Sequence, residues 1–269
     1  MLTLVPPVRS PVGVADILAA LAGRVERGAR FEERLGAEVG ATTVALYGSG
    51  RAALSTLLSA VRREGRDEVL VPAYTCWTVP AAVVRAGLRV RIADVDPVTC
   101  DFAPEALDRI EPGRLAAVVA THLCARSCDV TALVERLRAR DPEIVLIEDA
   151  AQAWPASVAT GADAVLLSFG RGKPLPLGGG GALLFPGGAM TRPGAARGGG
   201  LGDAFLFLAT VALGRPSTFR LPASIPALGI GRTVFDPAFD TMAPFREWQD
   251  RLGCCMLPRL GAWMAERGS

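Results

Sequence analysis

The sequence predicts an α/β fold in which a mostly parallel sheet is flanked by helices. Short runs of apolar and β-branched residues alternate along the chain with segments of helical spacing, which is the pattern of repeated βα units. The strand-like runs are apolar without interruption, as expected for strands that are covered on both faces. With 269 residues, half of them apolar, the chain is long enough for one large domain with a substantial core.

The elements follow one another in a regular order in the first two thirds of the chain. Residues 13–38 show apolar residues at helical spacing and predict one helix. Residues 43–47 form a short β-branched run that ends in Gly48-Ser49-Gly50, and residues 51–63 predict the helix that follows. Further strands are expected at residues 68–72, 89–93, 115–121, 144–147, 163–169 and 182–185, and further helices at 79–86, 104–110 and 130–138.

The last third of the chain is less regular. Residues 187–202 are rich in Gly, Pro and Arg and predict a loop, and residues 203–213 predict a helix. A proline-rich passage covers residues 216–237, and a final helix is expected at residues 245–264. We find no internal repeat.

Composition excludes several classes of protein. A net charge of +2, with the arginines dispersed among acids, does not indicate a nucleic-acid-binding protein or one that binds an anionic membrane. The first residues lack the pattern of a signal peptide, and the most apolar later segment, residues 204–213, is too short to span a bilayer. We therefore expect a cytoplasmic protein without membrane insertion.

The six cysteines form no CxxC pair and are too sparse for a disulfide scaffold. Cys124 and Cys128 lie near His122, but a second pair of zinc ligands is missing. The sequence thus predicts no metal site.

Residues that could bind a ligand or take part in catalysis lie where the predicted strands end. Because the carboxyl ends of parallel strands meet at one edge of a sheet, ligands bind there, and we expect these residues to converge. They are Gly48–Arg51, Tyr74–Trp77, His122, Asp149–Gln152 and Ser168–Lys173.

Lys173 is the only lysine among 29 basic residues. The composition suggests that arginine replaced lysine wherever a guanidinium would serve. An amine can lose its proton and condense with a carbonyl group, which a guanidinium cannot do. Lys173 is therefore a candidate for covalent chemistry rather than a chance survivor on the surface.

Asp149 is the second candidate residue, and its carboxylate complements the amine of Lys173. An ionised carboxylate at the mouth of a sheet can keep a pyridine nitrogen protonated, and with a lysine Schiff base it provides what pyridoxal 5′-phosphate (PLP) requires. The glycine turn at the start of a helix offers N–H donors for a phosphate, from Ser49, Gly50 and Arg51, and Ser168 adds a hydroxyl.

Five ordered motifs resemble the DegT/DnrJ/StrS sugar aminotransferases, a family of fold type I PLP enzymes. The resemblance covers roughly residues 25–185, and the ordered set is far more specific than any one of its members. The motifs are Gly48-Ser-Gly-Arg-Ala-Ala-Leu54, Pro72-Ala-Tyr-Thr75, Asp94-Val-Asp96, Glu148-Asp-Ala-Ala-Gln152-Ala, and Ser168-Phe with Lys173 and the glycine run at residues 178–181.

The resemblance implies a PLP-dependent transferase major domain and a role for each site residue. Lys173 would form the Schiff base with PLP and then move the proton between the substrate carbon and the cofactor. Asp149 would pair with the pyridine nitrogen, and Gln152 would approach the polar edge of the ring. Ser168 and the backbone of residues 49–51 would hold the phosphate.

Some positions depart from the family pattern. The residue expected over the ring is Cys76 or its neighbour Trp77, and the sequence leaves both open. Arg51 replaces the small hydroxyl residue common in the family, so its guanidinium either adds charge to the phosphate site or points to solvent. Gly170-Arg171-Gly172 replaces a common His-Pro before the lysine, and Gly179 replaces a common Glu, which puts the substrate preference in question.

The function implied by the resemblance is transfer of an amino group, from glutamate, to a keto group of a nucleotide-linked sugar for polysaccharide or glycoside synthesis. It also implies a homodimer with a shared active site. Dehydration of the sugar is disfavoured, because the related dehydratases lack the lysine.

We expect residues 1–240 to form the PLP-binding large domain and residues 241–269 to begin a connector to a largely absent small domain. The alternative is a truncated, non-catalytic PLP-binding paralogue or partner subunit that acts through its dimer surface.

Overall fold

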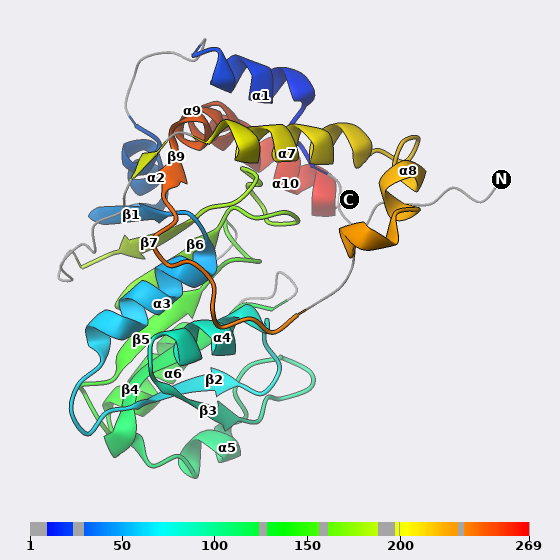
Figure 1. Ribbon diagram of the computed structural model, residues 1–269. Coiled ribbons are helices and arrows are strands. Elements are labelled where there is room, and N and C mark those ends of the chain that lie inside the picture. Colours follow the sequence, from blue (N-terminus) through cyan, green and yellow to red (C-terminus); the bar gives the residue numbers. More distant parts are fainter. Residues whose placement is uncertain are drawn as a thin grey trace.

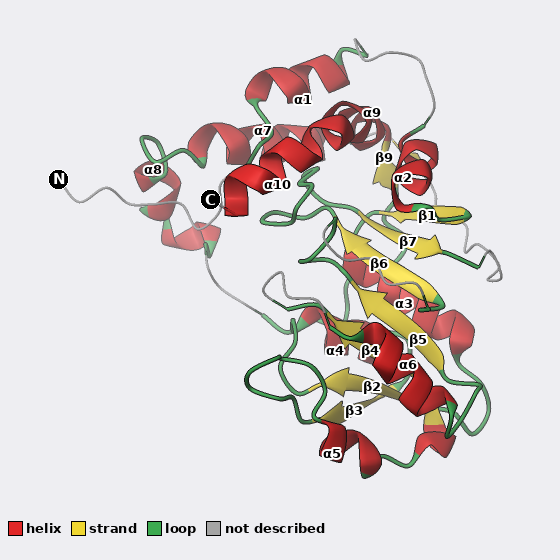
Figure 2. Ribbon diagram, turned by 180° about the vertical axis from the view of Figure 1, so that it is seen from behind, coloured by secondary structure: helices red, strands yellow, loops and turns green. Residues whose placement is uncertain are grey.

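A computed structural model describes residues 10–23, 30–123, 128–155, 161–187, 197–198, 200–230 and 234–268. In these residues a seven-stranded sheet is covered by helices on both faces (Figure 1). Helices α3 (Gly50–Val61) and α4 (Thr78–Arg85) lie on the face that is in front in Figure 1. Helix α6 (Val130–Arg138) lies on the opposite face, which Figure 2 shows. The predicted α/β class is confirmed.

The sheet is mostly parallel, as predicted. Its strand order is β1-β7-β6-β5-β4-β2-β3. Only β7 runs against its neighbours β1 and β6, and the other pairs are parallel. The strands are β1 (Thr43–Tyr47), β2 (Glu68–Pro72), β3 (Arg89–Ala93), β4 (Leu115–Thr121), β5 (Val145–Asp149), β6 (Ala164–Ser168) and β7 (Gly181–Phe185).

Each face of the sheet has its own apolar layer. Leu54, Leu57 and Leu58 of α3 are buried against the strands, as their helical spacing predicts. On the other face, α6 and the short α5 (Pro104–Asp108) bury Leu133 and Leu107. These helices cover the central strands on both sides, which is why the strands are apolar throughout.

The prediction of one helix over residues 13–38 is wrong. The structure has α1 (Val14–Leu21) and α2 (Phe31–Val39) instead. The first helix ends before Gly23, whose φ of +66° is the left-handed conformation that glycine adopts at little cost. Residues 24–29 lie outside the described part of the chain. Apolar spacing continues through the break, so the pattern alone did not reveal it.

The final predicted helix, residues 245–264, is also divided. Helix α9 (Glu247–Met256) is followed by a 3-10 turn at Leu257–Arg259 and then by α10 (Leu260–Gly268). Pro258 lies in the turn and lacks the N–H that a continuous helix needs. The first two residues of the predicted helix form strand β9 (Phe245–Arg246) instead.

The segment predicted as a loop, residues 187–202, is only partly described. Within it, β8 (Arg197–Gly198) pairs in parallel with β9. Helix α7 (Leu201–Leu213) confirms the predicted helix and begins two residues early. The proline-rich passage contains α8 (Arg220–Ala223) and a 3-10 turn, Pro226–Leu228.

The C-terminal helices pack beside the N-terminal ones at the β1 side of the sheet (Figures 1 and 2). Leu252 of α9 belongs to the same buried cluster as Ile17 of α1 and Leu35 of α2. Helices α9 and α10 therefore share a core with the start of the chain, through side chains between Trp248 and Trp263. A domain boundary near residue 240 stays a prediction.

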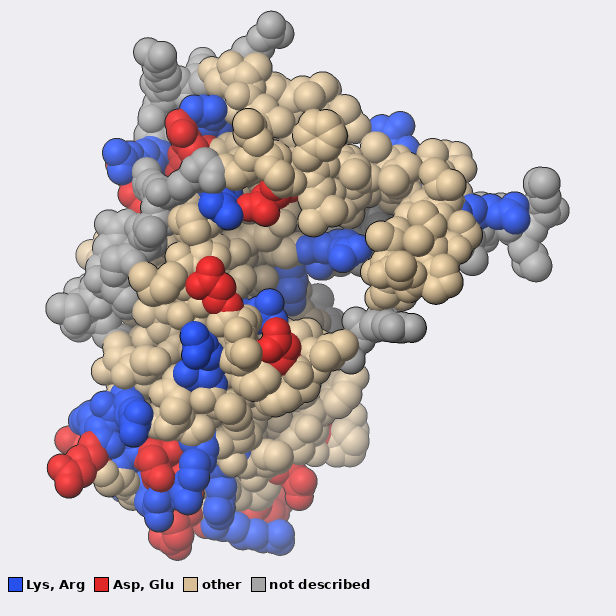
Figure 3. All heavy atoms as spheres, in the orientation of Figure 1, with Lys and Arg blue, Asp and Glu red and all other residues tan. Residues whose placement is uncertain are grey.

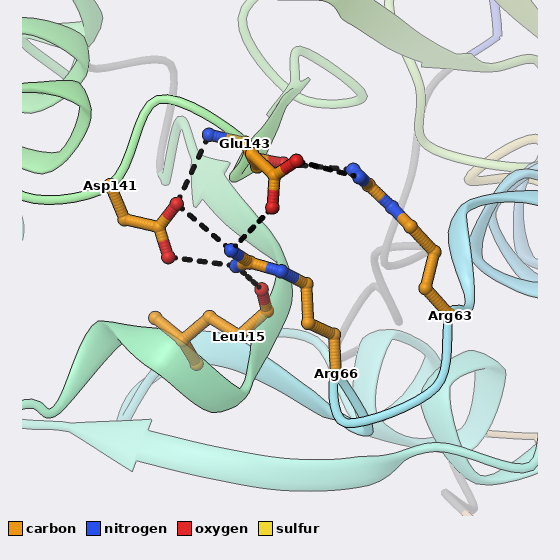
Figure 4. Close-up of polar contacts among 5 residues, drawn as sticks. All are labelled: Arg63, Arg66, Leu115, Asp141 and Glu143. Carbon is orange, nitrogen blue, oxygen red and sulfur yellow. Dashed lines mark hydrogen bonds and ion pairs between the residues drawn. The ribbon is translucent and has the colours of Figure 1, made fainter.

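A charged network ties the sheet together at the amino ends of its strands (Figure 4). The Arg66 guanidinium donates to both carboxylate oxygens of Asp141 at 2.8 and 3.0 Å, to Glu143 at 2.8 Å and to the Leu115 carbonyl at 2.9 Å. These bonds hold the pKa of Asp141 below its ordinary value. The network joins the approaches to β2, β4 and β5 at the edge of the sheet where these strands begin.

In the described residues, no helix combines the length and the apolar character needed to cross a bilayer. Charged side chains of both signs gather at the lower end of the molecule in Figure 3, whereas the surface over α7 and α8 is largely free of them.

Candidate active site

A cavity of about 220 Å³ lies at the carboxyl ends of the parallel strands. It brings together residues from five separate stretches of the sequence, as the sheet topology requires. The predicted site residues that line it are Ser49, Gly50, Arg51, Cys76, Asp149, Gln152, Ser168 and Lys173.

The turn Gly48–Arg51, here called the phosphate turn, forms one end of the cavity. Ser49 caps α3, and its Oγ accepts a hydrogen bond from the Ala52 N–H at 3.1 Å. The N–H groups of Gly50 and Arg51 are in the first turn of α3 and have no partner within the helix. An anion placed there would receive these donors and the positive potential of the helix end.

Glycines allow the loop after β6 to pack against this turn. A side chain at Gly181 would place its Cβ 2.5 Å from the Gly50 Cα, and one at Gly50 would lie 3.1 Å from the Ser168 Cβ. Gly180, with φ +97°, donates its N–H to the Gly48 carbonyl at 2.9 Å. The phosphate turn and the Ser168 hydroxyl are therefore held side by side by backbone contact.

Asp149 ends β5 at the floor of the cavity and is only 5% exposed. Its Oδ1 accepts from the Ala151 N–H at 3.1 Å. Burial raises the pKa of the Asp149 carboxyl above its ordinary value, while the Lys173 ammonium and the Ala151 N–H act in the opposite direction. A cationic partner in the cavity would relieve the cost of burying this charge.

Lys173 lies in the connection between β6 and β7, where its N–H donates to the Gly170 carbonyl at 3.2 Å. The side chain is half-buried and lines the same cavity as Asp149. Gly172, with φ +80°, allows the chain to turn directly before it. The connection thus brings the Lys173 amine to the cavity that Asp149 lines from the end of β5.

Cys76 lines the cavity, and Trp77 does not appear among its lining residues. The Thr78 hydroxyl donates to the Cys76 sulfur at 3.1 Å. The Trp77 ring instead lies 5.9 Å from the Arg51 guanidinium. Of the two residues that the sequence left open, Cys76 is thus the one that lines the cavity.

Behind Asp149 lies a fully buried pair, His122 and Glu148, joined at 2.7 Å between Nε2 and Oε1. The other ring nitrogen, Nδ1, accepts from the Cys128 N–H at 2.7 Å, so the proton of the neutral ring is on Nε2 and is donated to Glu148. The His122 N–H also donates to the Asp149 carbonyl at 3.1 Å. His122 is a structural support, and Cys124 lies outside the described residues.

The cavity also contains residues that the sequence did not predict as site residues. Thr121 is the last residue of β4, and its hydroxyl lies 3.3 Å from that of Thr75. The carboxyl-end rule that singled out His122 applies equally to Thr121, so a signal was present. Of the remaining lining residues, Leu54 and Ala151 lie within motifs that the sequence showed, whereas Thr78, Val79 and Leu166 have no signal apart from being apolar or small.

The residues of the cavity fit PLP. The phosphate turn and Ser168 supply donors for a dianion, Asp149 supplies a buried carboxylate for a ring nitrogen, and Lys173 supplies the amine. The glycines at positions 50 and 181 allow the close contact that holds the phosphate turn beside Ser168.

The model of the DegT/DnrJ/EryC1/StrS aminotransferase family matches residues 20–192, which is more than half of the chain. The chain belongs to this family. The match ends just beyond β7 and includes every predicted site residue.

Two curated relatives are similar to this chain over parts of their length. L-glutamine:2-deoxy-scyllo-inosose aminotransferase of Micromonospora echinospora is 35% identical over 153 residues, which are 54% of this chain and 35% of that protein. Spore coat polysaccharide biosynthesis protein SpsC of Bacillus subtilis is 30% identical over 159 residues, 57% of this chain and 40% of that protein. The matched part spans between 24% and 42% of the length of such relatives.

Solved structures share the fold over nearly the whole chain. The sugar aminotransferase CalS13 of Micromonospora echinospora has a TM-score of 0.63 and 25% identity, covering 97% of this chain and 69% of that one. The aminotransferase PseC of Helicobacter pylori, involved in the biosynthesis of pseudoaminic acid, has a TM-score of 0.65 at 17% identity, with 97% and 66% covered. The second likeness supports the fold alone.

Proposed function

We propose that the protein is a PLP-dependent aminotransferase that transfers an amino group from a donor, glutamate, to a keto group of a nucleotide-linked sugar. The observation that carries this proposal is one cavity lined by the only lysine of the chain, a buried carboxylate and the phosphate turn. Membership of the sugar aminotransferase family supports the reaction class.

Each residue has a task that follows from its position. Ser49, Ser168 and the N–H groups of residues 50 and 51 would bind the phosphate and fix the cofactor in the cavity. Asp149 would hold a proton at the ring nitrogen, and Cys76 would contact the ring face. PLP, when bound, supplies the electron sink that makes loss of a proton from the substrate carbon possible.

Lys173 would both attach PLP and move a proton between the substrate carbon and the cofactor, because its amine can exist in neutral form. Gln152 lines the cavity near the end of β5 and would approach the polar edge of the ring.

The proposal is tested by adding PLP and recording the visible absorption of lysine-linked cofactor. Lys173→Ala is expected to abolish this absorption, and Lys173→Arg is expected to do the same because a guanidinium does not condense with the aldehyde. Persistence of the unchanged band in both variants would falsify the assignment of Lys173.

Turnover requires a second measurement. Incubation of the PLP-loaded protein with glutamate is expected to give pyridoxamine phosphate, which can be separated and quantified. No conversion with glutamate or any other amino donor would favour the non-catalytic alternative, a PLP-binding partner subunit.

We propose further that the protein forms a homodimer in which each protomer contributes to the other's active site. Helix α7 supports this proposal, because it exposes the large apolar side chains of Leu201, Phe205 and Leu206. We also propose residues 1–240 as the PLP-binding large domain and residues 241–269 as the start of a connector.

A further inference from the structure

Arg51 is the position where the phosphate turn departs most clearly from the family pattern. Its side chain contacts a segment that lies far along the chain. This segment, residues 236–243, is here called the strap. It runs past α3 and α4 without helix or strand structure before reaching β9 (orange in Figure 1). Three features of the structure hold the strap in this place.

The first observation is the burial of Phe239 within an exposed strap. Phe239 is 4% exposed and belongs to the apolar cluster between the sheet and α3 and α4. Phe235, just before the strap, is 53% exposed, and Met242 within it is 73% exposed. Phe239 is therefore the anchoring side chain of the strap.

The second observation is the contact of Arg51 with this anchor. The Arg51 guanidinium carbon lies 4.7 Å from the centre of the Phe239 ring and 5.9 Å from that of Trp77. Both distances are in the range of a cation–π interaction. Arg85 of α4 adds a hydrogen bond of 3.2 Å from its Nε to the Phe239 carbonyl.

The third observation is a backbone bond between the strap and the phosphate turn itself. The Gly48 N–H donates to the Ala243 carbonyl at 3.0 Å. A Cβ at Gly48 would lie 2.4 Å from the Ala243 carbonyl oxygen, so the two backbones touch. The strap thus contacts the turn at its first residue, Gly48, and at its last, Arg51.

We propose that Arg51 is a positioning residue that docks the strap onto the phosphate turn. Its backbone N–H belongs to the first turn of α3, where the phosphate would bind, while its guanidinium lies over the Phe239 ring of the strap. Binding of the PLP phosphate and docking of the strap therefore stabilise each other, since both order the same four residues. The coupling to PLP rests on the proposed function, whereas the docking does not.

The test combines two variants of the contact with matched controls. Arg51→Gln removes the cation, and Phe239→Leu keeps an apolar side chain in the buried site but removes the ring. Arg109→Gln, at the exposed end of α5, controls for loss of an arginine, and Phe235→Ala controls for loss of a ring from an exposed site beside the strap. Arg51→Lys retains a cation and should rescue part of the effect.

Hydrogen exchange of peptides that cover residues 236–243 and Gly48 reports docking in the PLP-free protein, and PLP titration reports affinity. Arg51→Gln and Phe239→Leu are expected to speed exchange in both peptides and to weaken PLP binding about tenfold. The controls should change neither quantity. In the wild type, PLP should slow exchange of the strap.

Two results would overturn the inference. Unchanged exchange in Arg51→Gln would show that the guanidinium does not dock the strap. Faster exchange with unchanged PLP affinity would show that docking and phosphate binding are independent. A wild-type protein that fails to bind PLP at all would refute the proposed function and the coupling with it, while the exchange comparison would still decide the docking.

Discussion

Burial of the Asp149 carboxylate lowers the stability of the folded protein. Its pKa is raised, chiefly by burial, so between pH 4 and the raised value the folded state binds more protons than the unfolded state. Stability therefore falls as pH rises through this window. The Asp149 carboxylate thus destabilises the folded protein at a position where it would pair with the protonated ring nitrogen of the proposed cofactor.

We therefore expect Asp149→Asn to unfold at a higher denaturant concentration than the wild type in the PLP-free protein at pH 8, and to bind PLP more weakly. The stability difference between the variant and the wild type should shrink as pH falls toward 4, because the wild-type carboxyl then becomes neutral. Denaturant unfolding at several pH values measures it. A difference that does not depend on pH would contradict the role of the charge.

Individual site residues were predictable to different degrees. Lys173 and Asp149 followed from residue chemistry at the ends of apolar runs, and the structure brings both to one cavity. The direction of the Arg51 side chain did not follow, because its partner Phe239 is distant in sequence and lies in a segment without periodicity. The choice between Cys76 and Trp77 likewise depended on the backbone at the start of α4, which spacing does not determine.

At the scale of elements, the close contact between β7 and α3 is a sensitive point. Gly181→Ala would place a methyl group 2.5 Å from the Gly50 Cα, where only backbone can move. We expect a loss of stability of about 1–3 kcal/mol or more, together with weaker PLP binding, because the phosphate turn must shift.

Gly113→Ala is the matched control, since nothing lies within 4 Å of a Cβ at that position. Urea unfolding of both variants measures the difference. Equal stabilities would mean that α3 and β7 can separate without cost.

The buried pair of His122 and Glu148 joins the ends of β4 and β5. His122→Ala would remove the buried 2.7 Å hydrogen bond to the Glu148 carboxylate, and we expect a loss of about 1.5–3 kcal/mol in the free energy of unfolding. Arg136→Ala removes an exposed pair with Asp108 and should cost about 1 kcal/mol or less. Chemical denaturation of the two variants should reveal this contrast, and similar losses would refute it.

Strands and helices of the first two thirds of the chain followed from periodicity because each is bounded by glycine, proline or charged residues. The helix predicted at residues 13–38 and the one at 245–264 were continuous in pattern but are broken at Gly23 and Pro258 in the structure. The reversed direction of β7 could not be read from its apolar run, since both orientations bury the same side chains.

At the scale of the whole molecule, charge is distributed unevenly. The exposed apolar side chains of α7 lie on a part of the surface with few charged residues. Charged side chains of both signs gather at the other end of the molecule (Figure 3). A second copy of the chain would cover this face in the proposed homodimer.

Phe205→Glu with Leu206→Glu is expected to shift the protein toward monomer in sedimentation equilibrium, because two carboxylates would be buried unpaired at the contact. Ile92→Glu, an exposed apolar position on the edge strand β3, serves as the control and should leave association unchanged. A wild-type protein that is monomeric at high concentration would refute the dimer.

The overall architecture was predictable because alternating units allow few topologies. The packing of α9 on α1 and α2 could not be predicted. It joins the two ends of the sequence, and an apolar helix face does not indicate which other helix it packs against.

The strand order has a consequence for how the chain folds. Strands β6 and β7 are neighbours in both sequence and space, so the loop that carries Lys173 closes over a short distance. Strand β1, by contrast, pairs within the described residues only with β7, so this pairing joins segments that lie far apart in the sequence and is expected to form later. The phosphate turn follows β1 directly. Folding is therefore expected to deliver the amine early and the phosphate turn late, so that the cavity becomes able to hold PLP only as the sheet is completed.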